Sequence, residues 1–130
     1  MSKSRVLIVE DNVDNFELVR FLLERAGYQV LSAANGVEGV DAAKREQPDL
    51  VLMDLSMPEM DGWRATAQMK AEETTRHIPV LALTAHTLPG DRKRAIDAGC
   101  DGYISKPINV ASFDKLVATL LRQARAGLQS

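Results

Sequence analysis

Short apolar runs alternate with amphipathic stretches along almost the whole chain. The runs at residues 6–9 and 50–53 are too short for helices and show no polar alternation, which is typical of strands buried on both faces. Between such runs, apolar residues recur at helical spacing. The pattern predicts five strands, each followed by a helix. We place the strands at residues 6–9, 28–33, 50–54, 80–84 and 103–105.

Turn and cap residues set the predicted helix boundaries. Gly27 and Gly99 are suited to end helices in a left-handed conformation. Asn35, Asp61 and Asn109 are suited to begin helices as N-caps. Each helix except the last therefore lies between two predicted strands.

The strict alternation of strand and helix predicts a parallel sheet with helices on both faces. For five strands, the common solution is the flavodoxin-like doubly wound (βα)5 sandwich of the α/β class. Its strand order is 2-1-3-4-5, and its functional crevice lies between strands 1 and 3. No linker or repeat interrupts the pattern, so we expect one domain over residues 1–125 and a frayed tail over residues 126–130.

Composition narrows the classes of function. A formal net charge of −2, with 26% charged residues and no Lys/Arg-rich block, argues against direct contact with nucleic acid. The N-terminal residues lack the apolar core of a signal peptide, and no run is long enough to span a membrane. The single cysteine, Cys100, cannot form an internal disulfide and is expected to be buried as a small apolar residue. We therefore expect a cytoplasmic protein with no membrane contact.

Residues with chemical potential follow the ends of the predicted strands. Glu10 and Asp11 follow the first strand and Asp54 ends the third, so the fold predicts three carboxylates at the crevice. Their mutual repulsion requires a raised pKa or a cation. Hard oxygen ligands favour Mg²⁺, with Mn²⁺ as the alternative. Thr84 and Lys106 end the fourth and fifth strands at the same edge. A carboxylate nucleophile, a metal, a hydroxyl and an ammonium together are the parts of a phosphoryl-transfer site.

Four motifs resemble the receiver domain of two-component response regulators. They are E-D-N (10–12), L-M-D-L-S-M-P-E-M-D-G (52–62), L-T-A (83–85) and Y-I-S-K-P (103–107), and they extend over almost the whole chain. The chain is most similar to single-domain regulators of the DivK type. The resemblance implies a signalling switch that takes a phosphoryl group from a phosphohistidine of a sensor kinase or a histidine-phosphotransfer protein. Such a switch catalyses its own phosphorylation and dephosphorylation without being a turnover enzyme.

The resemblance also implies a role for each residue at the crevice. It makes Asp54 the phosphoacceptor in a Mg²⁺-dependent reaction. Glu10, Asp11 and Asp54 would hold the metal together with the backbone carbonyl of Ser56. Lys106 would pair with the phosphoryl group.

Two further residues would carry the signal outward. By the same resemblance, Thr84 would bind the phosphoryl oxygens and move inward, and Tyr103 would turn into the space that opens. The surface made by the fourth and fifth strands and helices would then change shape and switch a downstream protein target. Ser56 and His86 lie two positions beyond Asp54 and Thr84, and the resemblance implies that residues at these positions tune the lifetime of the phosphorylated state.

One apolar residue on the first helix is out of place. If Leu18, Leu22 and Ala26 face inward, a step of about 100° per residue puts Phe21 on the opposite side, among charged residues. This helix adjoins the crevice. We therefore expect Phe21 to contact the partner that carries the phosphohistidine.

Three other functions compete with this one. A small aspartyl-phosphate phosphatase of the haloacid dehalogenase type also uses a strand-end Asp, but it needs a second Asp two residues later, where this chain has Ser56. A flavodoxin-like flavin carrier needs a phosphate-binding first loop, and Glu10 and Asp11 would repel phosphate there. A receiver-fold scaffold that is never phosphorylated would not need these carboxylates together with Thr84 and Lys106.

Overall fold

In the part of the chain that the structure describes, five strands alternate with five helices. The computed structural model describes residues 3–57, 61–84 and 90–129. The strands are β1 (Arg5–Val9), β2 (Gln29–Ala33), β3 (Leu50–Asp54), β4 (Val80–Thr84) and β5 (Gly102–Ser105). The helices are α1 (Val13–Arg25), α2 (Gly36–Glu46), α3 (Asp61–Ala71), α4 (Asp91–Asp97) and α5 (Val110–Gln129).

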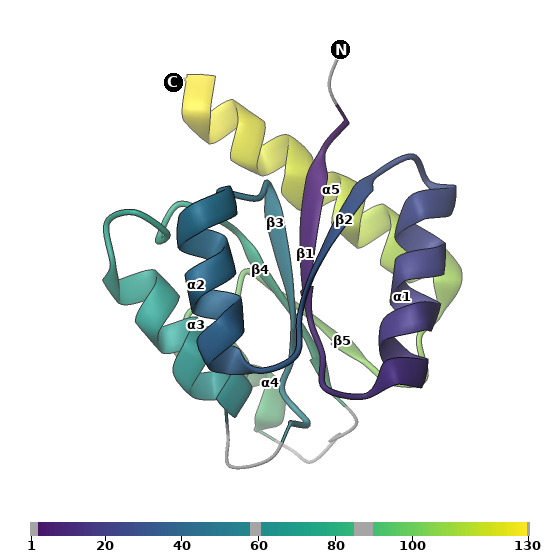
Figure 1. Ribbon diagram of the computed structural model, residues 1–130, viewed down its shortest axis with the longest axis horizontal. Helices are drawn as coiled ribbons and strands as arrows, with labels where there is room; N and C mark the ends of the chain where they lie inside the picture. The colour runs from purple at the N-terminus through teal and green to yellow at the C-terminus, as the bar shows by residue number, and fades with distance from the viewer. Residues whose placement is uncertain (1–2, 58–60, 85–89, 130) are drawn as a thin grey trace.

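The strands form one parallel sheet in the order β2-β1-β3-β4-β5, which confirms the predicted flavodoxin-like fold. Figure 1 shows α2 and α3 on one side of this sheet and α1 and α5 on the other. The register pairs Val9 with Met53 and Asp54 with Leu83. The carboxyl ends of the central strands therefore lie at one edge of the sheet.

Alternate residues of each strand enter two separate apolar cores. In β1, Leu7 and Val9 pack in the core that contains buried residues of α2, α3 and α4. Val6 and Ile8 pack in the core that contains those of α1 and α5. All residues of β3 and β4 are buried. Burial on both faces explains why these strands appear in the sequence as unbroken apolar runs.

Asparagine side chains cap helices where the sequence placed them. Asn35 Oδ1 accepts a hydrogen bond from the backbone N–H of Glu38 at 2.9 Å, and Asn35 Nδ2 donates to Glu38 Oε2 at 2.8 Å. Asn109 Oδ1 accepts from the backbone N–H of Ser112 at 3.0 Å. The prediction for α3 is off by one residue, because Asp61 is the first residue of the helix and not the residue before it.

The buried face of α1 differs from the predicted one. Leu22 is buried as predicted, together with Val19 and Leu23, whereas Leu18 is 49% exposed and Ala26 is exposed. The buried stripe is centred near Val19 and Leu23, and a step of about 100° per residue carries Leu18 to its border. Phe21 is 62% exposed, as predicted.

The C-terminal helix is longer than the sequence suggested. The α5 backbone continues to Gln129, so residues 126–129 extend the helix, although we expected them to fray. The domain boundary at residue 125 stays a prediction.

Cys100 is buried, as expected. No helix among the described residues has the length and apolar character needed to cross a membrane.

Close packing of α3 against the end of β3 leaves no room for a side chain at Gly62. A Cβ at Gly62 would lie 2.5 Å from the backbone oxygen of Asp54. Alanine would gain about 1 kcal/mol of helix propensity, but the overlap with backbone costs more, so we expect Gly62→Ala to lower the free energy of unfolding by about 1–3 kcal/mol. Urea unfolding measures this change. Gln68→Ala, at an exposed position of α3, is the control and should change stability by less than about 0.5 kcal/mol. A Gly62→Ala variant as stable as the parent protein would contradict the close approach.

Candidate functional site

The pleat of the sheet decides which of the predicted residues meet at its carboxyl edge. Alternate residues of β3 face the α1 and α5 side, and Asp54 continues that series. Glu10 and Lys106 each follow a strand by one residue, and their backbone N–H groups still donate to the neighbouring strand at 3.0 and 2.7 Å. The same alternation therefore brings Glu10, Asp54 and Lys106 to one side of the sheet.

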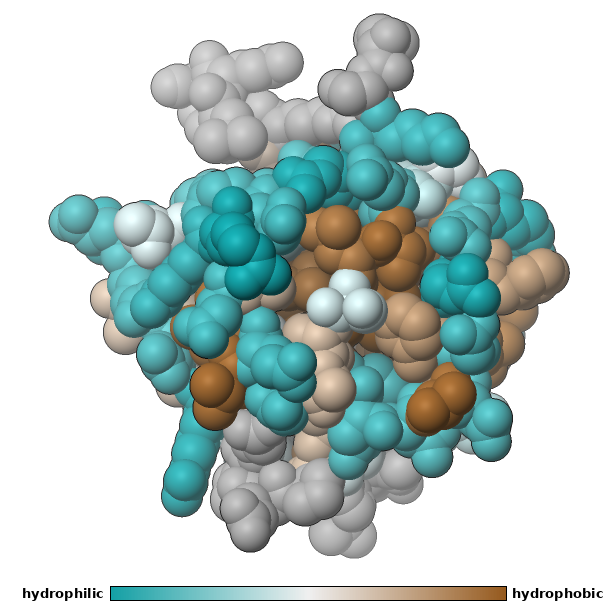
Figure 2. Space-filling view, in the orientation of Figure 1, coloured by the Kyte–Doolittle hydropathy of each residue, from teal (hydrophilic) through white to brown (hydrophobic). Residues whose placement is uncertain are grey.

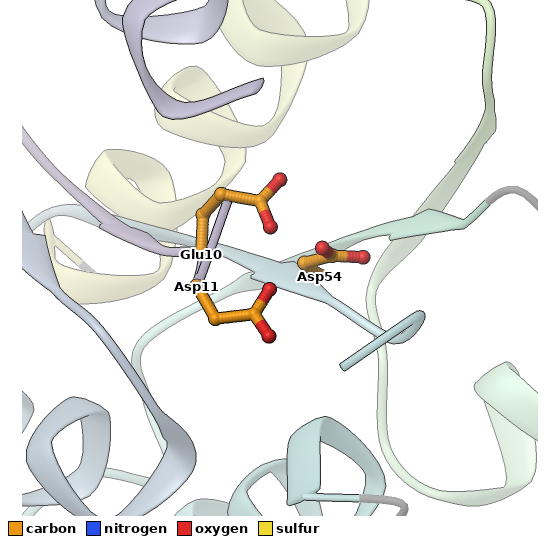
Figure 3. Close-up of side chains that lie close together, drawn as sticks. All are labelled: Glu10, Asp11 and Asp54. Carbon is orange, nitrogen blue, oxygen red and sulfur yellow. The ribbon is translucent and has the colours of Figure 1, made fainter. Parts of the chain in front are cut away.

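Glu10, Asp11 and Asp54 form a carboxylate cluster. One oxygen atom from each residue lies within 4.8 Å of the other two. Figure 3 shows the three side chains turned toward one space from the ends of β1 and β3. Glu10 and Asp54 are buried, at 5% and 2% exposure, whereas Asp11 is exposed. The cluster is therefore enclosed by protein on one side and reaches solvent through Asp11.

Two donors hold the Asp54 carboxylate. The backbone N–H of Ser56 donates to Asp54 Oδ1 at 2.8 Å. Lys106 Nζ lies 3.4 Å from the same oxygen and 3.6 Å from Glu10 Oε1. The Lys106–Pro107 peptide bond is cis. Because the Ser56 N–H and the Lys106 ammonium both contact Oδ1, the carboxylate of Asp54 has a defined orientation in the cluster.

The cluster carries more negative charge than Lys106 can balance. Burial is the main cause that raises the pKa of Glu10 to about 8. The adjacent Asp54 raises it further through a side-chain hydrogen bond and through its negative charge, whereas the positive charge of Lys106 lowers it. Glu10 Oε1 is buried and has no hydrogen-bond partner among the described residues. A cluster of oxygen donors with one such oxygen fits Mg²⁺, which prefers hard oxygen ligands and needs few of them from the protein.

Thr84 and Tyr103 lie on the other face of the sheet. Thr84 is 2% exposed at the end of β4, and half-buried Tyr103 packs against the core beneath α2, α3 and α4. The register pairs Ala82 with Tyr103, so Thr84 lies two residues further along the same face. The structure thus brings these two residues near each other, while their movement on phosphorylation stays a prediction.

The remaining predicted residues have mixed outcomes. Ser56 contacts Asp54 through its N–H, and metal binding by its carbonyl stays a prediction. His86 lies outside the described residues. Phe21 lies on the exposed face of α1 and does not belong to the carboxylate cluster. The sequence analysis did not single out Val13, which is 72% exposed at the start of α1 and lines a hollow together with Glu10 and Asp11. Its position one turn before Glu17, on the charged side of the helix, was the signal that could have identified it.

Comparison with known proteins assigns the family. The chain matches the model of the response regulator receiver domain over residues 6–119. The chain belongs to this family. This receiver domain is 44% identical to proteins named polar-differentiation response regulator DivK from Brucella anthropi and Brucella abortus. The similarity covers 95% of this chain and 100% of each relative.

Solved structures with the same fold include other receivers. One is the receiver domain of a sensor histidine kinase from Pseudomonas aeruginosa, which has a magnesium ion coordinated in its active site cleft. It is 35% identical, covers 92% of this chain and 98% of its own, and has a TM-score of 0.84. A putative response regulator from Chloroflexus aurantiacus is 27% identical over 93% of this receiver domain and 99% of its own chain, with a TM-score of 0.88.

The raised pKa of Glu10 generates a prediction for the receiver domain without metal. The pKa of Glu10 is about 8 in the folded protein and 4.5 for an ordinary glutamate. Between pH 4.5 and about pH 8, the folded protein therefore binds more protons at this residue than the unfolded chain does. The free energy of unfolding should therefore fall as the pH rises through this window. The whole fall equals about 1.4 kcal/mol for each unit by which the folded and unfolded pKa values differ. Asp54→Asn removes the negative charge beside Glu10, which is one cause of the raised pKa, and should therefore make the fall smaller. Urea unfolding in EDTA, from about pH 5 to about pH 8.5, measures both proteins.

The control is Asp41→Asn, which removes an exposed carboxylate of α2 that lies outside the carboxylate cluster. This variant should keep the pH dependence of the parent protein. Identical profiles for the Asp54→Asn and Asp41→Asn variants would contradict the coupling between Glu10 and Asp54.

Proposed function

We propose that this receiver domain is a stand-alone cytoplasmic switch that accepts a phosphoryl group on Asp54 from a phosphohistidine. The donor is a histidine kinase or a histidine-phosphotransfer protein, and the reaction needs Mg²⁺ or Mn²⁺. The observation that carries the proposal is the convergence of three carboxylates within 4.8 Å, with Lys106 Nζ 3.4 Å from Asp54. The similarity to DivK over the full length of those relatives, and the magnesium ion in the Pseudomonas receiver, support it.

The contacts of Asp54 suggest how its carboxylate reacts. The Ser56 N–H and Lys106 both address Oδ1, so we expect Oδ2 to attack the phosphorus. The new bond makes an acyl phosphate, the bond from phosphorus to the histidine nitrogen breaks, and that nitrogen keeps the electron pair. Glu10, Asp11, Asp54 and the carbonyl of Ser56 would hold the metal, which neutralises charge on the phosphoryl oxygens when bound. Lys106 would pair with one of those oxygens.

The effect of phosphorylation at Asp54 would reach the other face of the sheet through Thr84. Its hydroxyl would bond a phosphoryl oxygen, and Tyr103, two residues back along the neighbouring strand, would turn toward the space that opens. The surface of β4, α4, β5 and α5 would then present a new shape to a downstream protein target. Ser56 and His86 would set how long the phosphorylated state lasts.

The exposed side of α1 would receive the phosphodonor. Phe21 and Leu18 are 62% and 49% exposed and lie three residues apart on the same side of the helix. Arg25 near the end of α1 pairs with Asp114 of α5 at 2.9 Å, so this side adjoins α5. Two apolar side chains in such a position suit contact with another helix.

Phosphorylation by a small molecule tests the central claim. Incubation with acetyl phosphate and Mg²⁺ should add one acid-labile phosphoryl group, which mass spectrometry detects. Asp54→Ala should abolish the adduct, and Asp11→Asn should slow its formation by about tenfold or more, because the metal loses a ligand. Asp14→Asn, an exposed carboxylate outside the cluster, is the control and should react normally. No adduct would favour the scaffold, and an adduct that survives Asp54→Ala would refute the assignment of Asp54.

Transfer from a protein donor tests the role of Phe21. The donor is a purified histidine kinase or phosphotransfer protein that phosphorylates the parent receiver. Phe21→Ala should slow this transfer by about tenfold, since truncating one of the few anchor residues of an interface costs more than about 1 kcal/mol, and should leave reaction with acetyl phosphate unchanged. Ile96→Ala, at a 52% exposed position of α4, is the matched control. Equal rates for Phe21→Ala and the parent protein would refute the contact.

A further inference from the structure

A groove lies beside the carboxylate cluster, between the first turn of α1 and the end of β2. We name it the α1–β2 groove, and its volume is about 330 Å³. It borders the cluster because both include Glu10 and Asp11. The other lining residues that matter below are Val13, Phe16, Glu17 and Ala34.

The groove combines a hollow with exposed apolar surface. Val13 is 72% exposed, Phe16 is half-buried and Ala34 is exposed. Figure 2 shows apolar residues gathered between α1 and α2 over the edge strand β2; the most hydrophobic of them lie above the groove, which is at the lower end of β2 in this view. Apolar surface around a hollow is typical of an interaction site.

The charges of the groove have one sign. Glu10, Asp11 and Glu17 line it, and none of the described residues that line it is basic. Lys106 pairs with Glu10 within the cluster, and Arg20 pairs with Glu17 on the surface of α1. Asp11 and Glu17 are exposed, so a positively charged group can approach both from solvent.

We propose that the α1–β2 groove binds a basic, apolar segment of a partner protein. Apolar side chains of the segment would lie against Val13 and Phe16, and a Lys or Arg side chain would place its charge beside Asp11 and Glu17. The site is centred on the first turn of α1 and the end of β2, whereas Phe21 lies one turn after Glu17 on α1 and does not line the groove.

A defined peptide tests the groove. The probe is a fluorescent amphipathic peptide of Leu and Lys, and anisotropy reports its binding to the full chain. Glu17→Lys should weaken binding by about fivefold or more through charge reversal at the groove. Glu24→Lys is a matched control: Glu24 also lies on α1 and pairs with Arg20, its side chain is 51% exposed against 50% for Glu17, and it does not line the groove. This variant should weaken binding by less than about twofold.

A second pair of variants tests the apolar part. Val13→Ser should weaken binding by about threefold or more, and Val110→Ser, which replaces an exposed valine of α5, should not. A Ser/Lys peptide of the same charge should bind more weakly than the Leu/Lys peptide. Equal effects of Glu17→Lys and Glu24→Lys, or equal binding of the two peptides, would overturn the proposal in favour of general attraction between charges. A parent protein that is dimeric, together with a monomeric Val13→Ser variant, would overturn it in favour of a second copy of this chain.

Discussion

Repulsion among carboxylates at one sheet edge is the constraint on which the rest of the site depends. The buried strands β1 and β3 fix the positions of Glu10 and Asp54, so the two groups cannot move apart without disturbing the core. One ammonium, from Lys106, faces both of them. A site built with excess negative charge is stabilised by any cation that fits. Burial is the largest cause of the raised pKa of Glu10 and the adjacent Asp54 adds to it, so either a proton or a bound cation would relieve the same excess of negative charge.

The pleat of the sheet separates the proposed chemistry from the proposed response. Glu10, Asp54 and Lys106 belong to one alternation and face the side of α1 and α5. Thr84 and Tyr103 belong to the other and face the side of α4. Charge added at Asp54 can thus reach the second side only at the end of the strands, where Thr84 is next to Leu83, the register partner of Asp54. In the proposed switch, this geometry would allow the short side chain of Thr84 to connect the two sides.

The parts of the fold that could be predicted are those with a local signature. Residues 50–54 and 80–84 are buried on both faces, so their sequence shows the strand without reference to neighbours. The ends of the strands then predict which acidic residues lie together, because the carboxyl ends of parallel strands meet at one edge and alternate residues face opposite sides of the sheet. Exposure of Leu18 could not be predicted, since it depends on the rotation of α1 about its own axis against the sheet. The close approach of Gly62 to Asp54 could not either, because it joins two elements through the loop between them.

The proposed groove and the metal site share Glu10 and Asp11, so their ligands must influence each other. A basic segment and Mg²⁺ would both offset the same negative charge, and each would gain less in the presence of the other. By linkage, the two affinities would fall by the same factor. Glu17 changes this balance, because it lines the groove but does not belong to the carboxylate cluster. A partner that relies mainly on Glu17 and Val13 would therefore bind with little loss of metal affinity, whereas one that relies on Asp11 would compete with the metal.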